Sequence, residues 1–270
     1  MKRTLPDGFV GAVMAVESID DAVTFLHGPG GCRVRFMVYS SAVFPRVTLE
    51  ENDDYFVPYF YGYPRVPATF LDEYDYINGA FYKLEEGLPI ADMKDPKLIV
   101  VINSPGAGLI GDNHEKAIKE AGLQDKAIYM DEALVSTPMT MGYDHTLREI
   151  LEHLAPVRTE VEKDTVNLLG MTVLDKDWSA AVEEFKENLE SMGLRVRSVP
   201  GAGATIDELK DSLNAEYCVV VCPEACSSLC EFYGSKGLTV IRSDAGAPVG
   251  FDATEEFYRN IGKVTGKDPS

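Results

Sequence analysis

Hydrophobic and polar positions alternate most regularly in the second half of the chain, where short apolar segments are separated by amphipathic ones. The stretch Trp178–Met192 repeats apolar side chains at helical spacing from Val182 onward, with charged residues between them. Gly193 is a favourable residue for ending that helix. The apolar segments, which predict four strands, cover residues 166–170, 194–199, 217–221 and 238–241.

Predicted helices fall between these strands. Thr205 and Glu208 have the spacing of a capping box, which opens a helix that ends near Leu213. Two more helices are predicted at 225–233 and from about residue 254. Because strands and helices alternate, the pattern predicts a parallel sheet with helices on both faces.

The first half of the chain shows the same alternation less regularly. Three apolar segments predict strands at 22–26, 97–102 and 127–130. Two amphipathic segments predict helices at 112–121 and 142–154. The aromatic, proline-interrupted stretch Tyr55–Tyr63 is interpreted as an ordered loop or an edge element.

A proline and a charged run at Pro156–Asp164 indicate a boundary between the two halves. We therefore expect an N-terminal α/β unit over residues 1–160 and a second, Rossmann-like α/β unit over residues 161–270. The predicted fold class is α/β, with two doubly wound parallel-sheet units and a cleft between them.

Composition narrows the class of protein. The net charge of −19 disfavours nucleic acid and anionic lipid as partners and suits a partner with a basic docking face. No apolar run approaches the roughly 20 residues that span a bilayer, and the first residues lack the apolar stretch of a signal peptide. Five cysteines, four of them within 218–230, do not form a secreted disulfide framework. We expect a cytoplasmic protein whose thiols are free or metal-bound.

Two glycine-rich turns are candidates for chemistry. His27-Gly28-Pro29-Gly30-Gly31-Cys32 follows an apolar strand and would present a thiolate beside free amide groups, or else form a tight turn with a buried cysteine. The turn 103–113 leads from a strand into a helix, where amides favour an anion or a cluster edge. It is also compatible with an ordinary loop, since it lacks the dinucleotide fingerprint and the P-loop lysine.

The remaining cysteines recur every four residues, as Cys218, Cys222, Cys226 and Cys230. Cys222 falls at the carboxyl end of a strand, where open α/β sheets place ligands. Cys226 and Cys230 share one helix face and suit soft metals, or are small residues packed against a sheet. Cys218, in the middle of a strand, is expected in the core. The histidines His114, His145 and His153 show no metal-ligand spacing, and we expect solvated or capping roles for them.

Several of these segments occur in the order found in one family. The chain resembles component 1 of nitrogenase and its relatives, which include protochlorophyllide and chlorophyllide reductases, a reductive cyclase of coenzyme F430 synthesis and cofactor-assembly scaffolds. The segments that carry the resemblance are Gly11-Ala12, residues 19–22, residues 27–32, residues 73–79 with Lys83-Leu84, Leu109–Asn113, Gly142-Tyr143-Asp144, Val166–Gly170 and Pro248-Val249-Gly250 with Thr254.

The resemblance implies an oxidoreductase with two components. A separate ATP-hydrolysing iron–sulfur protein delivers single electrons to an iron–sulfur cluster between subunits of component 1. Three cysteines per subunit typically hold that cluster, and Cys32 matches one of them. The other two positions fall at about Asp7 and at Ser104 or Pro105. In the protochlorophyllide enzyme an aspartate is a cluster ligand, so Asp7 is retained as a candidate.

Further site residues follow from the same resemblance. Gly31 and Gly111 lie in the segments expected to bind the cofactor. Cys222 matches in register the cysteine that anchors the metal cofactor of nitrogenase, so it is either a cofactor ligand or a small residue at a strand end. Whether a second metal cofactor or a tetrapyrrole binds stays open. Cys226 and Cys230 are weaker metal candidates. Family members usually contain a third α/β unit that this sequence lacks, so it represents either an N-terminal fragment or a short relative.

The resulting hypothesis is a component 1-like subunit that works with an ATP-dependent iron–sulfur reductase. It would form a homodimer, or a heteromer with a paralogous subunit, without nucleic acid or membrane. The alternatives are a non-enzymatic metallocluster or tetrapyrrole carrier or scaffold, and a cluster-free binding protein. The substrate stays open among dinitrogen, tetrapyrroles and thioethers.

Overall fold

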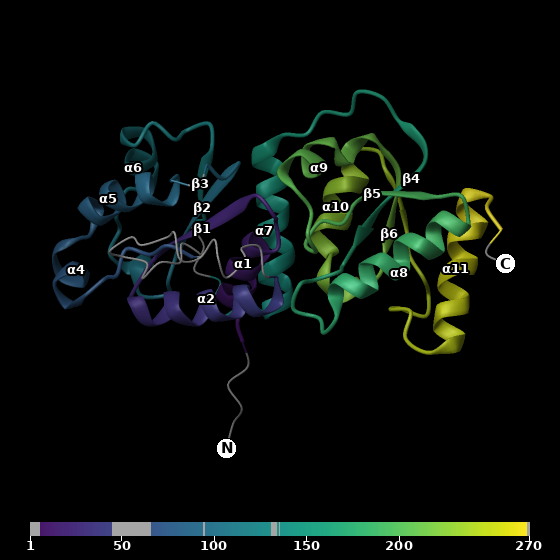
Figure 1. The fold of residues 1–270 in the computed structure, drawn as a ribbon, viewed down its shortest axis with the longest axis horizontal. Helices are drawn as coiled ribbons and strands as arrows, with labels where there is room; N and C mark the ends of the chain where they lie inside the picture. Colours follow the sequence, from purple (N-terminus) through teal and green to yellow (C-terminus); the bar gives the residue numbers. More distant parts are fainter. Residues whose placement is uncertain (1–5, 45–65, 94, 131–133, 135, 269–270) are drawn as a thin grey trace, which may run out of the picture. The chain divides into compact units, whose positions relative to one another are not determined.

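The computed structural model describes residues 6–44, 66–93, 95–130, 134 and 136–268 (Figure 1). The element expected at Tyr55–Tyr63 lies outside the described residues. The chain divides into two compact units, Met1–Gly142 and Tyr143–Ser270, called unit 1 and unit 2 below.

Unit 1 contains a parallel sheet in the order β1-β2-β3. Its strands are β1 (Ala22–His27), β2 (Leu98–Asn103) and β3 (Ala127–Met130). Its helices are α1 (Gly8–Glu17), α2 (Gly30–Val43), α4 (Glu73–Asn78), α5 (Phe81–Ala91), the short η1 (Ala107–Leu109) and α6 (His114–Glu120), before α7 (Met139–Leu154) begins.

The sheet of unit 1 is covered by helices that bury their apolar stripes. Leu84 and Leu88 of α5 pack with Ile118 of α6 against Phe25 and Val101 of the strands. Helix α1, buried along almost its whole length, contacts β1 and β2 from the other side of the sheet (Figure 1). Each strand therefore ends between helices, at the edge where the glycine-rich turns lie.

Unit 2 contains a second parallel sheet, in the order β5-β4-β6-β7. Its strands are β4 (Glu162–Leu169), β5 (Arg195–Ser198), β6 (Ala215–Val220) and β7 (Thr239–Ile241). Its helices are α8 (Trp178–Ser191), α9 (Ile206–Asp211), η2 (Ser212–Asn214), η3 (Pro223–Ala225), α10 (Ser227–Ser235) and α11 (Phe251–Thr265).

Helices cover both faces of this sheet (Figure 1). On one face Val166 and Leu168 of β4 pack with Leu189 of α8 and Phe257 of α11. On the opposite face the Asn167 side-chain amide donates to the carbonyl of Ser212, beside α9 and α10. Since side chains alternate along a strand, this placement confirms the predicted α/β fold with doubly wound parallel sheets.

The division between the units falls inside α7, earlier in the chain than the expected boundary at 160/161. The Tyr143 hydroxyl donates to the carbonyl of Gly201 at 2.5 Å. The Asp144 carboxylate accepts from the amides of Ser228 and Leu229 at 2.6 and 3.0 Å. These side chains bind α7 to unit 2, so the proline and charged run that suggested the boundary lie within that unit.

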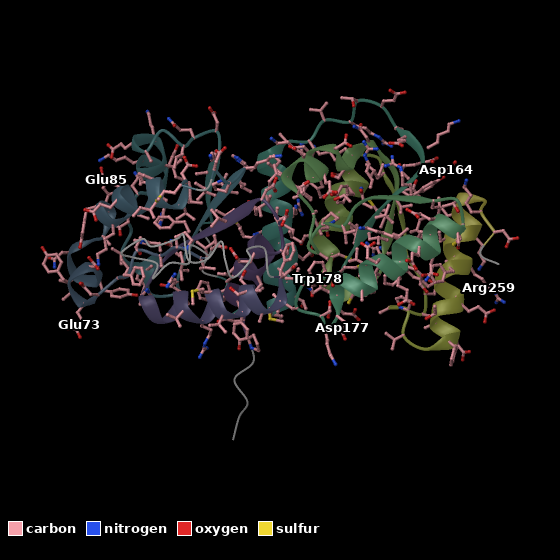
Figure 2. The ribbon with its side chains drawn as sticks, viewed as in Figure 1. Glu73, Glu85, Asp164, Asp177, Trp178 and Arg259 are labelled. Carbon is pink, nitrogen blue, oxygen red and sulfur yellow. The ribbon has the colours of Figure 1, made fainter. Side chains whose placement is uncertain are left out.

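Many charged side chains lie on the outside of each unit, although Glu17, Arg33 and Asp75 are buried. Figure 2 shows Glu73 and Glu85 projecting outward from unit 1, and Asp164 and Asp177 projecting outward from unit 2. This accounts for a folded chain with a net charge of −19, because exposed carboxylates keep their hydration. Among the helices described, none combines the length and apolar character needed to cross a membrane.

Candidate functional site

The carboxyl ends of β1 and β2 bring the two glycine-rich turns of unit 1 together. The amide of Ser104 donates to the carbonyl of His27, and the amide of Gly28 donates to the Thr69 hydroxyl at 3.0 Å. A Cβ at Gly28 would lie 2.8 Å from the Ser104 side chain, so glycine allows this close approach. These two turns, far apart in sequence, therefore lie side by side in the fold.

His27 and Asp112 form the central polar contact of this region. The Nε2 atom of fully buried His27 lies 3.1 Å from Oδ2 of Asp112, which also accepts from the amide of Ala80. Burial and the neighbouring His114 lower the pKa of His27 to about 4, against an opposing effect from Asp112. His27 is therefore neutral at pH 7 and donates Nε2–H to the carboxylate, which leaves Nδ1 as an acceptor.

His114 is buried, so the solvated or capping role expected for it is wrong. Its ring meets the ring of His27 edge to face, with centroids 5.3 Å apart, and stacks on Tyr129 at 5.8 Å. Asn113 is the residue that caps α6. Sequence reasoning missed the pair of His27 and Asp112 because 85 positions separate them.

Cys32 lies in the first turn of α2 and is half-buried. Burial raises the pKa of its thiol, and the positive charge of Arg35 opposes this rise. Helix α2 starts without a side-chain cap. Cys32 therefore lies at a positive helix end, a setting in which a cation or helix dipole favours the thiolate.

Asp7 and Gly111 are two other residues of unit 1 predicted at the site. The Asp7 carboxylate accepts from the amide of Val10 at 3.4 Å and caps α1. Gly111 adopts a positive φ directly before Asp112. Across the residues that the structure describes, no three side chains of His, Cys, Asp or Glu gather as a metal-binding group. Cys32 and Asp7 thus do not form a complete ligand set within one chain.

In unit 2, Cys222 follows β6 beside the end of β4. In the sheet, the strand that follows β4 lies on one side of the pair, and the strand that follows β6 lies on the other side. The carboxyl ends of β4 and β6 therefore mark the topological switch point. Gly170, with a φ of +86°, brings the chain against this turn: a Cβ there would lie 2.2 Å from the carbonyl oxygen of Cys222. The predicted residue therefore stands where this fold class places ligands.

The surroundings of Cys222 are acidic. Its Sγ lies 3.3 Å from Oε2 of Glu224. Burial first, and then Glu224 and Asp175, raise the pKa of the Cys222 thiol. The thiol is consequently protonated at pH 7, and a bound cation would be needed to favour its thiolate.

Three further cysteines lie near this turn. Cys218 is fully buried in β6, as expected for a core residue. The buried sulfurs of Cys226 and Cys230 lie 3.8 Å apart, and the Cys226 thiol donates to the carbonyl of Cys222 at 3.2 Å. The hydrogen-bonded contact between the two sulfurs and the charge of Arg242 lower the pKa of Cys230, whereas burial opposes this change. The fold therefore brings Cys226 and Cys230 together at the start of α10.

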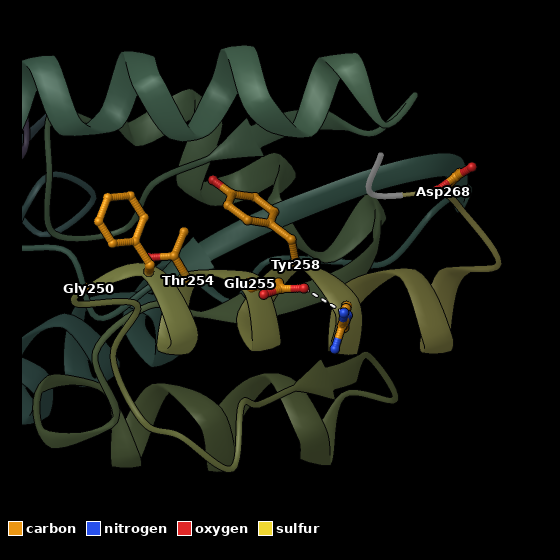
Figure 3. A pocket seen from close by; sticks show the side chains of 7 residues that line it. Gly250, Thr254, Glu255, Tyr258 and Asp268 are labelled. Carbon is orange, nitrogen blue, oxygen red and sulfur yellow. Dashed lines mark hydrogen bonds and ion pairs between the residues drawn. The ribbon is translucent and has the colours of Figure 1, made fainter.

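A separate hollow of about 760 Å³ lies along α11 (Figure 3). Glu255 and Arg259 on its wall pair with each other at 2.5 Å, and the Thr254 hydroxyl donates to the carbonyl of Pro248. The Phe251 side chain at its end is 97% exposed. Because its charged and hydroxyl groups already bind each other or the backbone, this hollow is a surface feature and not a reactive centre.

Comparisons with known proteins agree with this architecture. The model of the nitrogenase component 1 type oxidoreductase family matches residues 8–270. A light-independent protochlorophyllide reductase polypeptide of Halorhodospira halophila is 34% identical over 108 residues, covering 38% of this chain and 19% of that protein. The nitrogenase molybdenum-iron protein beta chain of Bradyrhizobium diazoefficiens is 23% identical over 96% of this chain and 52% of its own length.

The same similarity is seen in solved structures. Nitrogenase Cp1 at pH 5 superposes with a TM-score of 0.70 and 22% sequence identity, covering 99% of this chain and 54% of the nitrogenase chain. At this identity the superposition shows the fold alone. The chain spans about half or less of the length of these relatives. With the family model matching nearly the whole sequence, the chain belongs to the nitrogenase component 1 type oxidoreductase family.

Proposed function

We propose that this chain is a component 1-like subunit that accepts electrons from an ATP-dependent iron–sulfur reductase and passes them to a substrate. The family match supports an oxidoreductase of this type. The net charge of −19 suits a docking partner with a basic face. The observation that carries the proposal is the position of Cys32, half-exposed in the first turn of α2 at the carboxyl edge of a parallel sheet.

The described residues of one chain do not supply all the ligands of an iron–sulfur cluster. The described residues contain no group of three ligands. The Ser104 hydroxyl, near the position of a family cysteine, is buried and finds no hydrogen-bond partner among the described residues. Iron–sulfur clusters are held mainly by thiolates, so a cluster on Cys32 requires ligands from a second subunit. When bound, such a cluster would accept and release single electrons.

The surface beside Cys32 supports association with a second subunit. Helix α2 exposes Val34 and Val38, one helical turn apart, and Tyr39 beside them, each about half exposed. Apolar side chains grouped on one helix face are typical of protein–protein contacts. We therefore propose a dimer, formed with a second copy or a paralogous subunit, in which each chain contributes Cys32.

Iron binding tests this proposal. Wild-type protein and Cys32→Ala are reconstituted side by side with iron and sulfide without oxygen, and iron and acid-labile sulfide are measured. We expect the wild type to bind iron and Cys32→Ala to lose it, while Cys218→Ala keeps it because Cys218 is inside the sheet. Equal iron in the wild type and Cys32→Ala would overturn the assignment of Cys32.

Asp7 needs a matched substitution because it also caps α1. Asp7→Ser keeps a capping oxygen and removes the carboxylate, so it separates helix stability from ligation. If Asp7 is a ligand, Asp7→Ser binds less iron at unchanged stability. Unchanged iron content would restrict Asp7 to its capping role.

A carrier or scaffold without its own reductase activity is the second candidate. It is favoured by the incomplete ligand set of the described residues. Anaerobic assays with an ATP-dependent iron–sulfur reductase separate the two. Oxidation of that reductase that depends on both ATP and this chain supports electron acceptance, whereas iron binding without such oxidation supports a carrier.

A further inference from the structure

We propose that Cys226 and Cys230 form a binding site for one soft monovalent metal ion of the Cu(I) class. Their sulfurs lie 3.8 Å apart at the start of α10. The site lies in unit 2, where the chain is described continuously from residue 136 to 268. It does not depend on the iron-binding function proposed for Cys32 in unit 1.

The separation of the two sulfurs fits a shared metal ion. With metal–sulfur bonds of about 2.3 Å, two thiolates on one ion can lie up to roughly 4.6 Å apart. A two-coordinate ion holds its sulfurs near that limit, so the pair would separate from the observed 3.8 Å by up to about 0.8 Å on binding. Both cysteines are free thiols in the structure and are therefore available as ligands.

The number of available ligands selects the class of ion. No third histidine, cysteine or carboxylate joins the pair in the part of the chain that the structure describes. Structural zinc takes four ligands, and iron–sulfur clusters take a larger set of thiolates. Soft sulfur ligands select Cu(I), for which two thiolates form a sufficient set.

Burial and local charge act on this site in both directions. Cys226 and Cys230 are 0% and 5% exposed, so water has little access to a metal between them. Binding replaces two thiol protons: Cu⁺ and two thiols give a bis-thiolate complex of charge −1 and two protons. Arg242 offsets part of that negative charge at Cys230, whereas the contact with Cys230, burial and the carboxylate of Asp144 raise the pKa of Cys226, so the ion has to displace a tightly held proton there.

The start of α10 is held in place from outside the helix. Cys226 occupies its N-cap position without a side-chain cap bond. Asp144 of α7 instead accepts from the amides of Ser228 and Leu229. The two sulfurs are therefore positioned by a fixed backbone, and the ion would need only a rotation of Cys226 away from the carbonyl of Cys222.

Competition with a chelator tests the site. Reduced protein is titrated without oxygen into the coloured bicinchoninate complex of Cu(I), and the loss of its absorbance is followed as the protein takes up the ion. The wild type should remove one equivalent of Cu(I), and Cys226→Ser and Cys230→Ser should each bind it more than about 100-fold more weakly. Cys218→Ser and Cys32→Ala are the matched controls and should behave as the wild type. Tight binding by both serine variants would overturn the proposal.

Protection from alkylation gives a measurement on the wild type that needs no variant. The protein reacts with N-ethylmaleimide in the lowest urea concentration at which the metal-free pair is labelled, because both thiols are buried in the native fold. After full denaturation, cleavage after lysine, arginine and glutamate releases Ala225–Glu231, in which the cysteines are Cys226 and Cys230. The same digest releases Tyr217–Glu224 with Cys218 and Cys222 as an internal reference. Cu(I) should protect the first peptide and Zn(II) should not. Protection by Zn(II) alone, or equal labelling with and without Cu(I), would contradict the site.

Cys222 provides the remaining control because its backbone contacts Cys226 while its thiol faces Glu224. For a two-sulfur site, Cys222→Ser should change Cu(I) affinity by no more than about threefold. A loss as large as that of Cys226→Ser would overturn the two-sulfur site. Iron binding by Cys226→Ser should equal that of the wild type, which separates failure of this site from failure of the Cys32 proposal.

Discussion

The turn after β1 in unit 1 and the turn after β6 in unit 2 have the same topology and opposite electrostatics. Each follows a parallel strand and carries a half-buried cysteine, Cys32 in one and Cys222 in the other. Burial raises the pKa of both thiols. Arg35 opposes this rise at Cys32, whereas Glu224 and Asp175 add to it at Cys222.

This difference separates the roles of the two cysteines. A positive neighbour makes the thiolate less costly to form at Cys32, although burial keeps the pKa of that thiol above its ordinary value. An acidic surrounding favours a neutral thiol, which becomes a ligand only when a cation offsets the carboxylates. The same strand end can thus support different chemistry, because the charges come from residues outside the strand.

The largest expected effect is on stability, and it compares a glycine beside each cysteine: Gly170 at the turn of Cys222 and Gly31 at the turn of Cys32. Gly170→Ala should lower the free energy of unfolding by about 3 kcal/mol or more, since its φ is +86° and its Cβ would meet the backbone of Cys222. Gly31→Ala should be neutral or stabilising by up to about 1 kcal/mol, because it is helical and meets open space. Urea unfolding, followed by the fluorescence of Trp178 in unit 2 and by circular dichroism, measures both. Equal costs would show that the two turns are packed alike.

The second prediction concerns the buried histidine beside the first turn. The pKa of His27 is lowered to about 4 in the folded chain from 6.5, so between these pH values the unfolded chain binds more protons. Stability should therefore fall by about 3 kcal/mol as pH drops from 6.5 to 4, and should be fully present above 6.5.

His27→Asn removes the titrating group and provides the control. Its stability should depend less on pH across that window, whatever its stability at pH 7. The measurement is urea unfolding by circular dichroism at intervals of pH. If the wild type and His27→Asn show parallel profiles, the burial of a neutral His27 is not what links stability to pH.

The smallest expected effect is on thiol reactivity. Arg35→Gln should slow alkylation of Cys32 by iodoacetamide, and Glu224→Gln should speed that of Cys222, each by roughly two- to fivefold at neutral pH. The first change removes a charge that favours the thiolate, and the second removes one that disfavours it. Peptide mass spectrometry gives both rates. Arg259→Gln is the control, because Arg259 pairs with Glu255 on α11. Changes of the same sign in the two variants would refute the electrostatic contrast.

Local sequence patterns predicted the elements that carry both turns. Strand β1 covers the expected segment 22–26, β6 overlaps the expected segment 217–221, and Thr205 and Glu208 form the expected capping box. These features depend on near neighbours in the chain: periodic burial, a side chain that caps its own helix, and glycine after a strand. For the same reason the order of the motifs was sufficient to indicate the family.

The contacts that define the candidate sites depend on residues distant in sequence. Asp144 lies within α7, and its carboxylate caps α10 by accepting from the amide of Ser228. The division between the units falls inside α7. His114 was expected in solvent or at a cap, but its ring is enclosed by His27 and Tyr129. No local pattern specifies such partners.

The sequence by itself determined the α/β class, the strands that end in glycine-rich turns and the placement of a cysteine after β1 and after β6, because backbone propensity and burial period are local properties. Only the tertiary structure decided which charges face those cysteines, that His27 is neutral against Asp112, and that the sulfurs of Cys226 and Cys230 lie 3.8 Å apart. Electrostatic and metal-binding properties depend on distances in space, and folding sets those distances by packing side chains from separate elements.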